Sequence, residues 1–207
     1  WQIAEFYIDD FNKGFKEMNF LPPKLFSRAT EHIKEQIDLV QRIQEKGFTY
    51  KTNDGIYFDV GRYESQGNIY GELSTLDNIK EGARIEANPE KIVPRDFALW
   101  KFSPKGSKRD MEWDSPWGIG FPGWHIECSA MSIKYLGEQF DIHVGGEDIR
   151  ATHHPNEVAQ SEAATEKKPF VKYWVHGAFL LVDGKRMGKS VGNAYTLEDL
   201  RKKEFIL

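Results

Sequence analysis

The sequence predicts an α/β fold built around a parallel sheet, and the order of segments in its last third carries that prediction. A helical segment at 125–136 (HIECSAMSIKYL) precedes strand-like FDIHVGG at 140–146, a second helix at 155–168 and strand-like KYWVHGAFLLV at 172–182. Two strands joined through a helix lie parallel in one sheet. With 40% hydrophobic and 14% aromatic residues, the 207-residue chain also has enough apolar side chains for a core.

Residues 1–47 are predicted to be helical. Apolar residues in the second half of this segment recur at helical spacing, namely Ile33, Ile37, Val40 and Ile43. Thr30 is a candidate N-cap for that helix, and Gly47 is a candidate for the residue just past its end. Because Leu21-Pro22-Pro23 interrupts the chain before it, we expect two helices paired as an αα-hairpin.

Residues 48–116 are predicted to be a β-rich insertion at the surface. FTYKT and IYFDV flank Asn53-Asp54-Gly55, which is typical of a β-hairpin turn. The tract at 101–120 is rich in glycine, proline, serine and charge, so we expect exposed loop there. The third region, 117–207, contains the parallel sheet and a last helix at 197–204.

The bulk composition predicts a cytoplasmic protein without membrane contact. No apolar run approaches the roughly 20 residues of a membrane helix, and the chain opens on polar, acidic WQIAEFYIDDF rather than a secretory leader. A single cysteine cannot form an internal disulfide, which is typical of a reducing compartment. The net charge of −4 provides no general attraction for nucleic acid, so any such contact needs a local patch.

Three residues have the chemistry of a metal site. His153 and Glu157 stand four apart in a predicted helix and so share one face, and Cys128 is the only cysteine. Thiolate, imidazole and carboxylate are ligands that zinc takes, and three protein ligands with one exchangeable position is the catalytic pattern. Ordinary alternatives remain for each: a buried cysteine, a histidine that caps a helix, and a glutamate that favours the helix dipole.

Two further segments have candidate binding residues. Gly145, Gly146 and Asp148 follow the strand at 140–146, where ligands of parallel sheets gather, although a tight turn would explain the glycines equally well. Arg186 and Lys189 lie in a basic, glycine-containing segment that is suited to phosphate groups, or that is simply a solvated turn.

Three segments resemble, in order, consecutive signatures of the cysteinyl-tRNA synthetases, a family of class I aminoacyl-tRNA synthetases. These segments are PGWHIECSAM, FDIHVGGEDIRATHHPNEVAQSEA and KYWVHGAFLLVDGKRMGKSVGN. LPPKLFSRATEHI, GIYFDV, YGELS and DFALWK are similar to the segments that precede them in the family. The resemblance covers nearly the whole chain and implies the second half of a Rossmann-type catalytic domain with a helical and small-β connective insertion.

The resemblance also implies a zinc ion, one per subunit, that binds the thiol of the substrate cysteine. Its ligands would be Cys128, His153 and Glu157, and the fourth family ligand is a cysteine ahead of a HIGH motif. Neither that cysteine nor a HIGH motif occurs in this sequence. We therefore expect a fragment without the HIGH half and without the anticodon-binding helical domain, inactive by itself.

Further roles follow from the same resemblance. Trp124 resembles the residue that closes over the substrate side chain, and Asp148 resembles an aspartate that holds the ribose or the substrate amine. Gly145 and Gly146 would let adenosine approach, and His176 resembles the residue at the adenine edge. The family's KMSKS loop occurs here as RMGKS, residues 186–190, which keeps its second lysine.

The implied reaction is activation of L-cysteine by ATP with Mg²⁺, followed by transfer of the cysteinyl group to tRNA(Cys) by a monomeric enzyme. Lys189, with Arg186 in support, would neutralise the leaving pyrophosphate. Two alternatives stay open from the sequence: a related ligase of the mycothiol type that joins activated cysteine to an amino sugar, and a non-catalytic zinc-binding paralogue.

Overall fold

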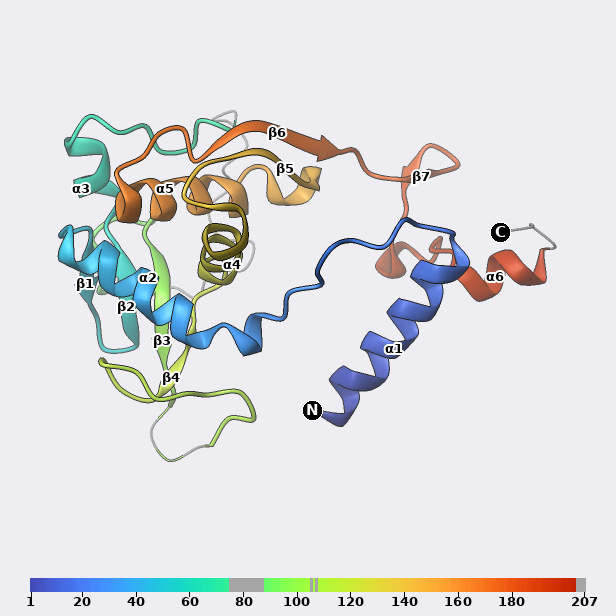
Figure 1. Ribbon diagram of the computed structural model, residues 1–207, viewed down its shortest axis with the longest axis horizontal. Coiled ribbons are helices and arrows are strands. Elements are labelled where there is room, and N and C mark those ends of the chain that lie inside the picture. Colours follow the sequence, from blue (N-terminus) through green and yellow to red (C-terminus); the bar gives the residue numbers. More distant parts are fainter. Residues whose placement is uncertain (75–87, 105, 107, 204–207) are drawn as a thin grey trace. The chain divides into compact units, whose positions relative to one another are not determined.

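The computed structural model describes residues 1–74, 88–104, 106 and 108–203 (Figure 1). It divides the chain into two compact units. The larger contains Ser27–Ala178, and the smaller joins Trp1–Phe26 to the segment from Phe179 onward. The smaller unit combines the two ends of the chain, so these units do not correspond to the three regions predicted from the sequence. The division into regions at residues 47 and 116 stays a prediction.

An antiparallel sheet of four strands in the order β1-β2-β3-β4 lies in the larger unit. The strands are β1 (Thr49–Lys51), β2 (Gly55–Phe58), β3 (Phe97–Phe102) and β4 (Gly120–Pro122). The pairing of β1 with β2 confirms the predicted hairpin. The chain that follows β4 passes so close to β3 that a Cβ on Gly123 would lie 1.8 Å from the Ala98 carbonyl oxygen.

Helices cover this sheet and close the main core. They are α2 (Ile33–Glu45), α3 (Val60–Ser65), α4 (Ile126–Leu136) and α5 (His153–Thr165). Their apolar faces and the sheet share one cluster whose fully buried members include Val40, Ile43, Phe58, Leu99 and Trp100. Such burial of large side chains is the main stabilising contribution to this unit.

The start and end of α2 test the predicted caps. The N-cap is His32 rather than Thr30, because Ala29–Glu31 already forms a 3₁₀ turn in front of the helix. Gly47 has φ 79° just past the C-cap, Lys46, as predicted. A left-handed residue at this position favours glycine because a side chain would be strained there.

The parallel pair predicted from segment order is present. Strand β5 (Phe140–Gly146) pairs in parallel with β6 (Val171–Gly177), and α5 connects them (Figure 1). This arrangement confirms the α/β class. Pro155 lies in the first turn of α5, where its missing N–H removes no helical hydrogen bond.

The smaller unit contains α1 (Gln2–Glu17), a hairpin of β7 (Leu181–Val182) and β8 (Lys185–Arg186), and α6 (Leu197–Lys202). The expected αα-hairpin of α1 with α2 is wrong, since α1 clusters instead with the C-terminal segment. An ion pair from Arg201 to Glu17 holds the two together, with 2.6 Å between Arg201 Nε and Glu17 Oε1.

Helix α6 begins with a capping box in which Thr196 and Asp199 exchange hydrogen bonds. Among the residues that the structure describes, no helix combines the length and the apolar character needed to cross a membrane.

Candidate metal centre

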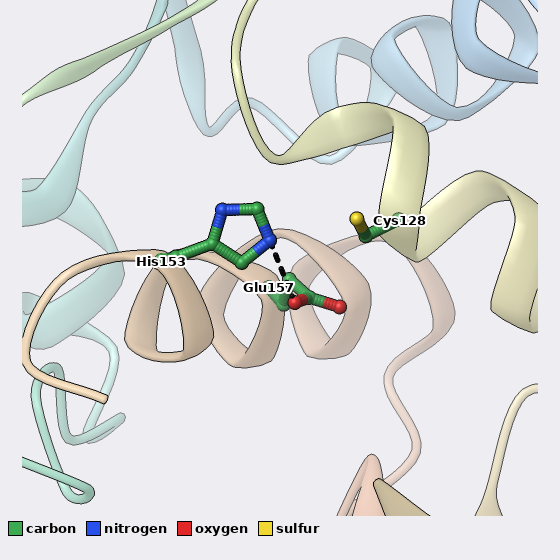
Figure 2. A group of neighbouring side chains, drawn as sticks. All are labelled: Cys128, His153 and Glu157. Carbon is green, nitrogen blue, oxygen red and sulfur yellow. Dashed lines mark ion pairs between the residues drawn. The ribbon is translucent and has the colours of Figure 1, made fainter. Parts of the chain in front are cut away.

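The candidate centre lies where the first turns of α4 and α5 face each other. Cys128 belongs to α4, and His153 and Glu157 lie one turn apart on α5. Their ligand atoms all lie within 4.8 Å of one another. In Figure 2 the His153 ring and the Cys128 sulfur lie on opposite sides of the view, and the Glu157 carboxylate lies below and between them. The structure thus brings Cys128 next to two donors that follow it by 25 or more residues in the sequence. Those two donors, His153 and Glu157, are only four residues apart.

Glu157 is the buried anion of this cluster. Its side chain is fully buried, and Oε1 lies 3.0 Å from His153 Nε2 and 3.2 Å from His143 Nε2. Burial pushes the pKa of Glu157 upward, but the hydrogen bonds and charges of the two histidines outweigh it and leave the pKa below its usual value. Its second oxygen, Oε2, has no hydrogen-bond partner among the described residues.

A buried carboxylate oxygen without a partner is costly, and a cation is the group that relieves the cost most directly. Cys128 offers a sulfur atom within reach of the same cation. Burial raises the pKa of its thiol well above the usual range, and the charges of Glu157 and Glu127 raise it further. A divalent cation reverses this effect, since a coordinated thiol loses its proton. The donor set therefore fits zinc.

Trp124 borders the cluster at the start of α4. Its ring stacks on the His125 ring with centroids 5.9 Å apart and meets the His153 ring edge to face at 6.4 Å. The Trp124 side chain is nevertheless 57% exposed. It is placed to cover a small ligand beside His153, and that role stays a prediction.

Three histidines that the sequence did not single out, His125, His143 and His154, extend the centre beyond the predicted residues. His125 lies against His153, and burial, with a smaller effect from His153, lowers the pKa of His125 to about 3. His143 and His154 form a second group of donors with Glu157. His154 is fully buried, which lowers its pKa to about 4, and its Nδ1 lies 2.8 Å from His176 Nε2.

Gly145 and Gly146 lie at the carboxyl end of β5, as predicted. A Cβ on Gly145 would lie 2.5 Å from His154 Cε1, so close packing of α5 requires glycine here. A Cβ on Gly146 would lie 2.4 Å from Asp148 Oδ1. Asp148 is exposed in the 3₁₀ turn after β5, and His176 pairs with Gly145 across the parallel ladder. Roles for these residues in nucleotide binding stay predictions.

Arg186 and Lys189 belong to the smaller unit, and both are exposed. Arg186 lies at the end of β8 with its guanidinium 3.9 Å from the Phe179 ring centroid. The Asn193 side chain accepts a hydrogen bond from Gly188 N–H and donates one to the Arg186 carbonyl. Asn193 thereby holds the first half of the RMGKS segment, from Arg186 to Gly188, a role that the sequence did not indicate.

With a parallel pair, a zinc-type donor set and a basic glycine-containing segment in place, comparison with known proteins defines the class. Residues 1–205 match the family of class I (C) tRNA synthetase catalytic domains, and the chain belongs to that family. Curated relatives include the cysteine–tRNA ligase of Treponema denticola, 48% identical over 206 residues, 99% of this chain and 41% of the relative. The cysteine–tRNA ligase of Thermococcus onnurineus is 46% identical over 202 residues, 98% of this chain and again 41% of the relative. The chain therefore spans about two fifths of the relatives that it matches.

Proposed function

We propose that the full-length protein activates L-cysteine with ATP and Mg²⁺ to cysteinyl-adenylate and transfers the cysteinyl group to tRNA(Cys). The observation that supports this most is the convergence of Cys128, His153 and Glu157 in a chain of the synthetase family. The relatives are named cysteine–tRNA ligases, which favours tRNA over an amino sugar as the acceptor.

The proposed site addresses a problem of specificity. Serine differs from cysteine by one atom, and a pocket that recognises shape alone separates such near-isosteres by only about 10–200-fold. Zinc held by Cys128, His153 and Glu157 would supply a soft cation that distinguishes a thiol from a hydroxyl by the type of bond. Trp124, beside His153, would cover the small side chain of the substrate.

The remaining chemistry requires positioning and positive charge. The cysteine carboxylate is already a nucleophile, so attack on the α-phosphate of ATP needs no general base. We propose that Lys189, supported by Arg186, neutralises the charge that develops on the leaving pyrophosphate. Gly145, Gly146, Asp148 and His176 would receive the adenosine or the substrate amine at the carboxyl ends of β5 and β6.

We further propose that the protein acts in the cytoplasm as a monomer. The one cysteine of these 207 residues is a member of the candidate metal centre, and a reducing compartment keeps such a thiol available for a metal.

The test uses full-length protein and measures zinc content, cysteine-dependent ATP–pyrophosphate exchange and charging of tRNA(Cys). Cys128→Ser should lower the zinc content and raise the KM for cysteine, whereas Ser132→Ala, on the next turn of α4, should change neither. Unchanged zinc content and KM in Cys128→Ser would refute the ligand assignment. ATP–pyrophosphate exchange followed by transfer to an amino sugar, but not to tRNA, would indicate a mycothiol-type ligase. Zinc binding without ATP–pyrophosphate exchange would indicate a non-catalytic paralogue.

A further inference from the structure

His125 occupies a strained position next to the candidate centre. Its backbone has φ 113° and ψ −31° at the N-cap of α4, a region that residues other than glycine rarely adopt. Two hydrogen bonds maintain this conformation. The His125 N–H donates to Glu127 Oε2 at 2.7 Å, and the Gln160 side chain donates to the His125 carbonyl at 2.7 Å. Strain of this kind persists at functional sites because the surroundings enforce it.

The strained backbone directs the His125 imidazole at His153. The two ring centroids lie 4.5 Å apart, and 2.6 Å separates the two Nδ1 atoms. Trp124 stacks on the His125 ring, and Phe97 meets it edge to face at 6.1 Å. The imidazole is thus held by neighbours on several sides, while its Nδ1 has one specific partner.

The surroundings of the two nitrogens of His153 determine whether the hydrogen between the two Nδ1 atoms belongs to His153 or to His125. Nε2 lies toward Glu157, 3.0 Å from its Oε1, and is the nitrogen that belongs to the donor set. A metal ligand must offer a lone pair, so a neutral His153 that binds through Nε2 carries its one proton on Nδ1. His125 Nδ1, at 2.6 Å, must then accept that proton's hydrogen bond and keep its own proton on Nε2.

We infer that His125 is a positioning residue for the metal centre: it accepts a hydrogen bond from His153 Nδ1–H and so fixes the tautomer and ring orientation that present Nε2 to the cation. This inference rests on the proposed zinc site and deepens it. Outer partners of this kind orient ligand histidines in metal sites generally, most often as carboxylates or carbonyls. Here a second imidazole fills that role, and the strained backbone is the means of placing it.

Three variants of the full-length protein separate this role from a merely structural one. His125→Gly relieves the strain and removes the acceptor, so it should keep or raise the thermal midpoint while zinc affinity falls about 10–100-fold. His125→Asn offers an oxygen near the place of Nδ1 and tolerates positive φ, so it should retain zinc affinity within about threefold. Phe97→Leu loosens packing against the same ring, and it should lower the midpoint with zinc affinity unchanged.

Zinc affinity is measured by competition with a chromophoric chelator, and the spectrum of cobalt(II)-substituted protein reports the ligand field. In His125→Gly the cobalt(II) bands should shift from those of the wild type, and in His125→Asn they should not. If His125→Gly binds zinc as tightly as the wild type, with the same cobalt(II) spectrum, while Cys128→Ser binds zinc more weakly, this inference alone is overturned. If the wild type binds no zinc, or if Cys128→Ser binds it normally, the proposed function is overturned with it.

Discussion

Glu157→Gln is the substitution whose effect follows most directly from the structure. It keeps the shape of a fully buried side chain and removes its charge. If the amide oxygen stays toward His143 and His153, the amide NH₂ takes the position of Oε2, where no described residue offers a partner. A buried donor left unpaired costs about 1–3 kcal/mol, so the metal-free protein should lose stability by that order.

The loss of zinc affinity should be larger. Mutation of a residue that only hydrogen-bonds to a metal-coordinating side chain lowers metal affinity by about 10–100-fold. Glu157 is proposed as a ligand itself and supplies the negative charge of the donor set, so we expect at least about 100-fold. At about 1.4 kcal/mol for each tenfold change, this is about 2.8 kcal/mol or more.

Chelator competition on full-length protein at fixed pH measures this loss. The matched control is Glu162→Gln, which changes another buried carboxylate of α5 and leaves the donor set intact. Glu162 accepts from the Phe170 N–H at 3.1 Å and from the Tyr63 hydroxyl at 3.2 Å rather than facing the metal centre. Equal zinc affinities in the two variants would refute the assignment of Glu157 as a ligand.

Three further outcomes are expected. Lys189→Ala should slow adenylate formation far more than it weakens cysteine binding, as single-turnover kinetics would show, and equal losses would count against a transition-state role. Burial raises the pKa of Glu162 above 4.5, so the folded state binds this proton more tightly than the unfolded state, and the associated stability is lost as pH rises through the raised pKa. Glu162→Gln should therefore gain stability relative to the wild type between pH 4.5 and neutral pH in denaturant titrations, and a pH-independent difference would contradict this. Gly123→Ala should destabilise the protein by about 3 kcal/mol or more, because its Cβ would lie 1.8 Å from the Ala98 oxygen. The control Gly67→Ala, in open space at φ 84°, should cost about 1 kcal/mol. Similar thermal midpoints for the two variants would contradict the packing argument.

Local patterns in the sequence predicted the parts of the site that depend on local geometry. The spacing of His153 and Glu157 places both on one face of α5 because a helical turn spans four residues. The segment order predicted that β5 and β6 run parallel with α5 between them. These features follow from a few neighbouring residues, so the sequence alone was sufficient.

Features that depend on contacts between distant segments were missed. His143 shares a face of β5 with Gly145, but only the structure shows that α5 covers that face while Ile142 and Val144 on the other face are exposed. The predicted partner of α1 was wrong because Glu17 pairs with a residue 184 positions away, which periodicity within α1 cannot reveal. The strained backbone of His125 likewise has no signal in WHIEC, since positive φ is uncommon in any residue other than glycine.

X-ray absorption at the zinc edge of the zinc-loaded, full-length protein tests the central claim most directly. Coordination by Cys128 should appear as sulfur scattering at about 2.3 Å, together with nitrogen and oxygen at about 2.0–2.2 Å. Cys128→Ser should remove one sulfur from the coordination shell and leave the nitrogen and oxygen ligands in place. An unchanged sulfur count in Cys128→Ser would show that the metal lies elsewhere and would contradict the proposed convergence of thiolate, imidazole and carboxylate.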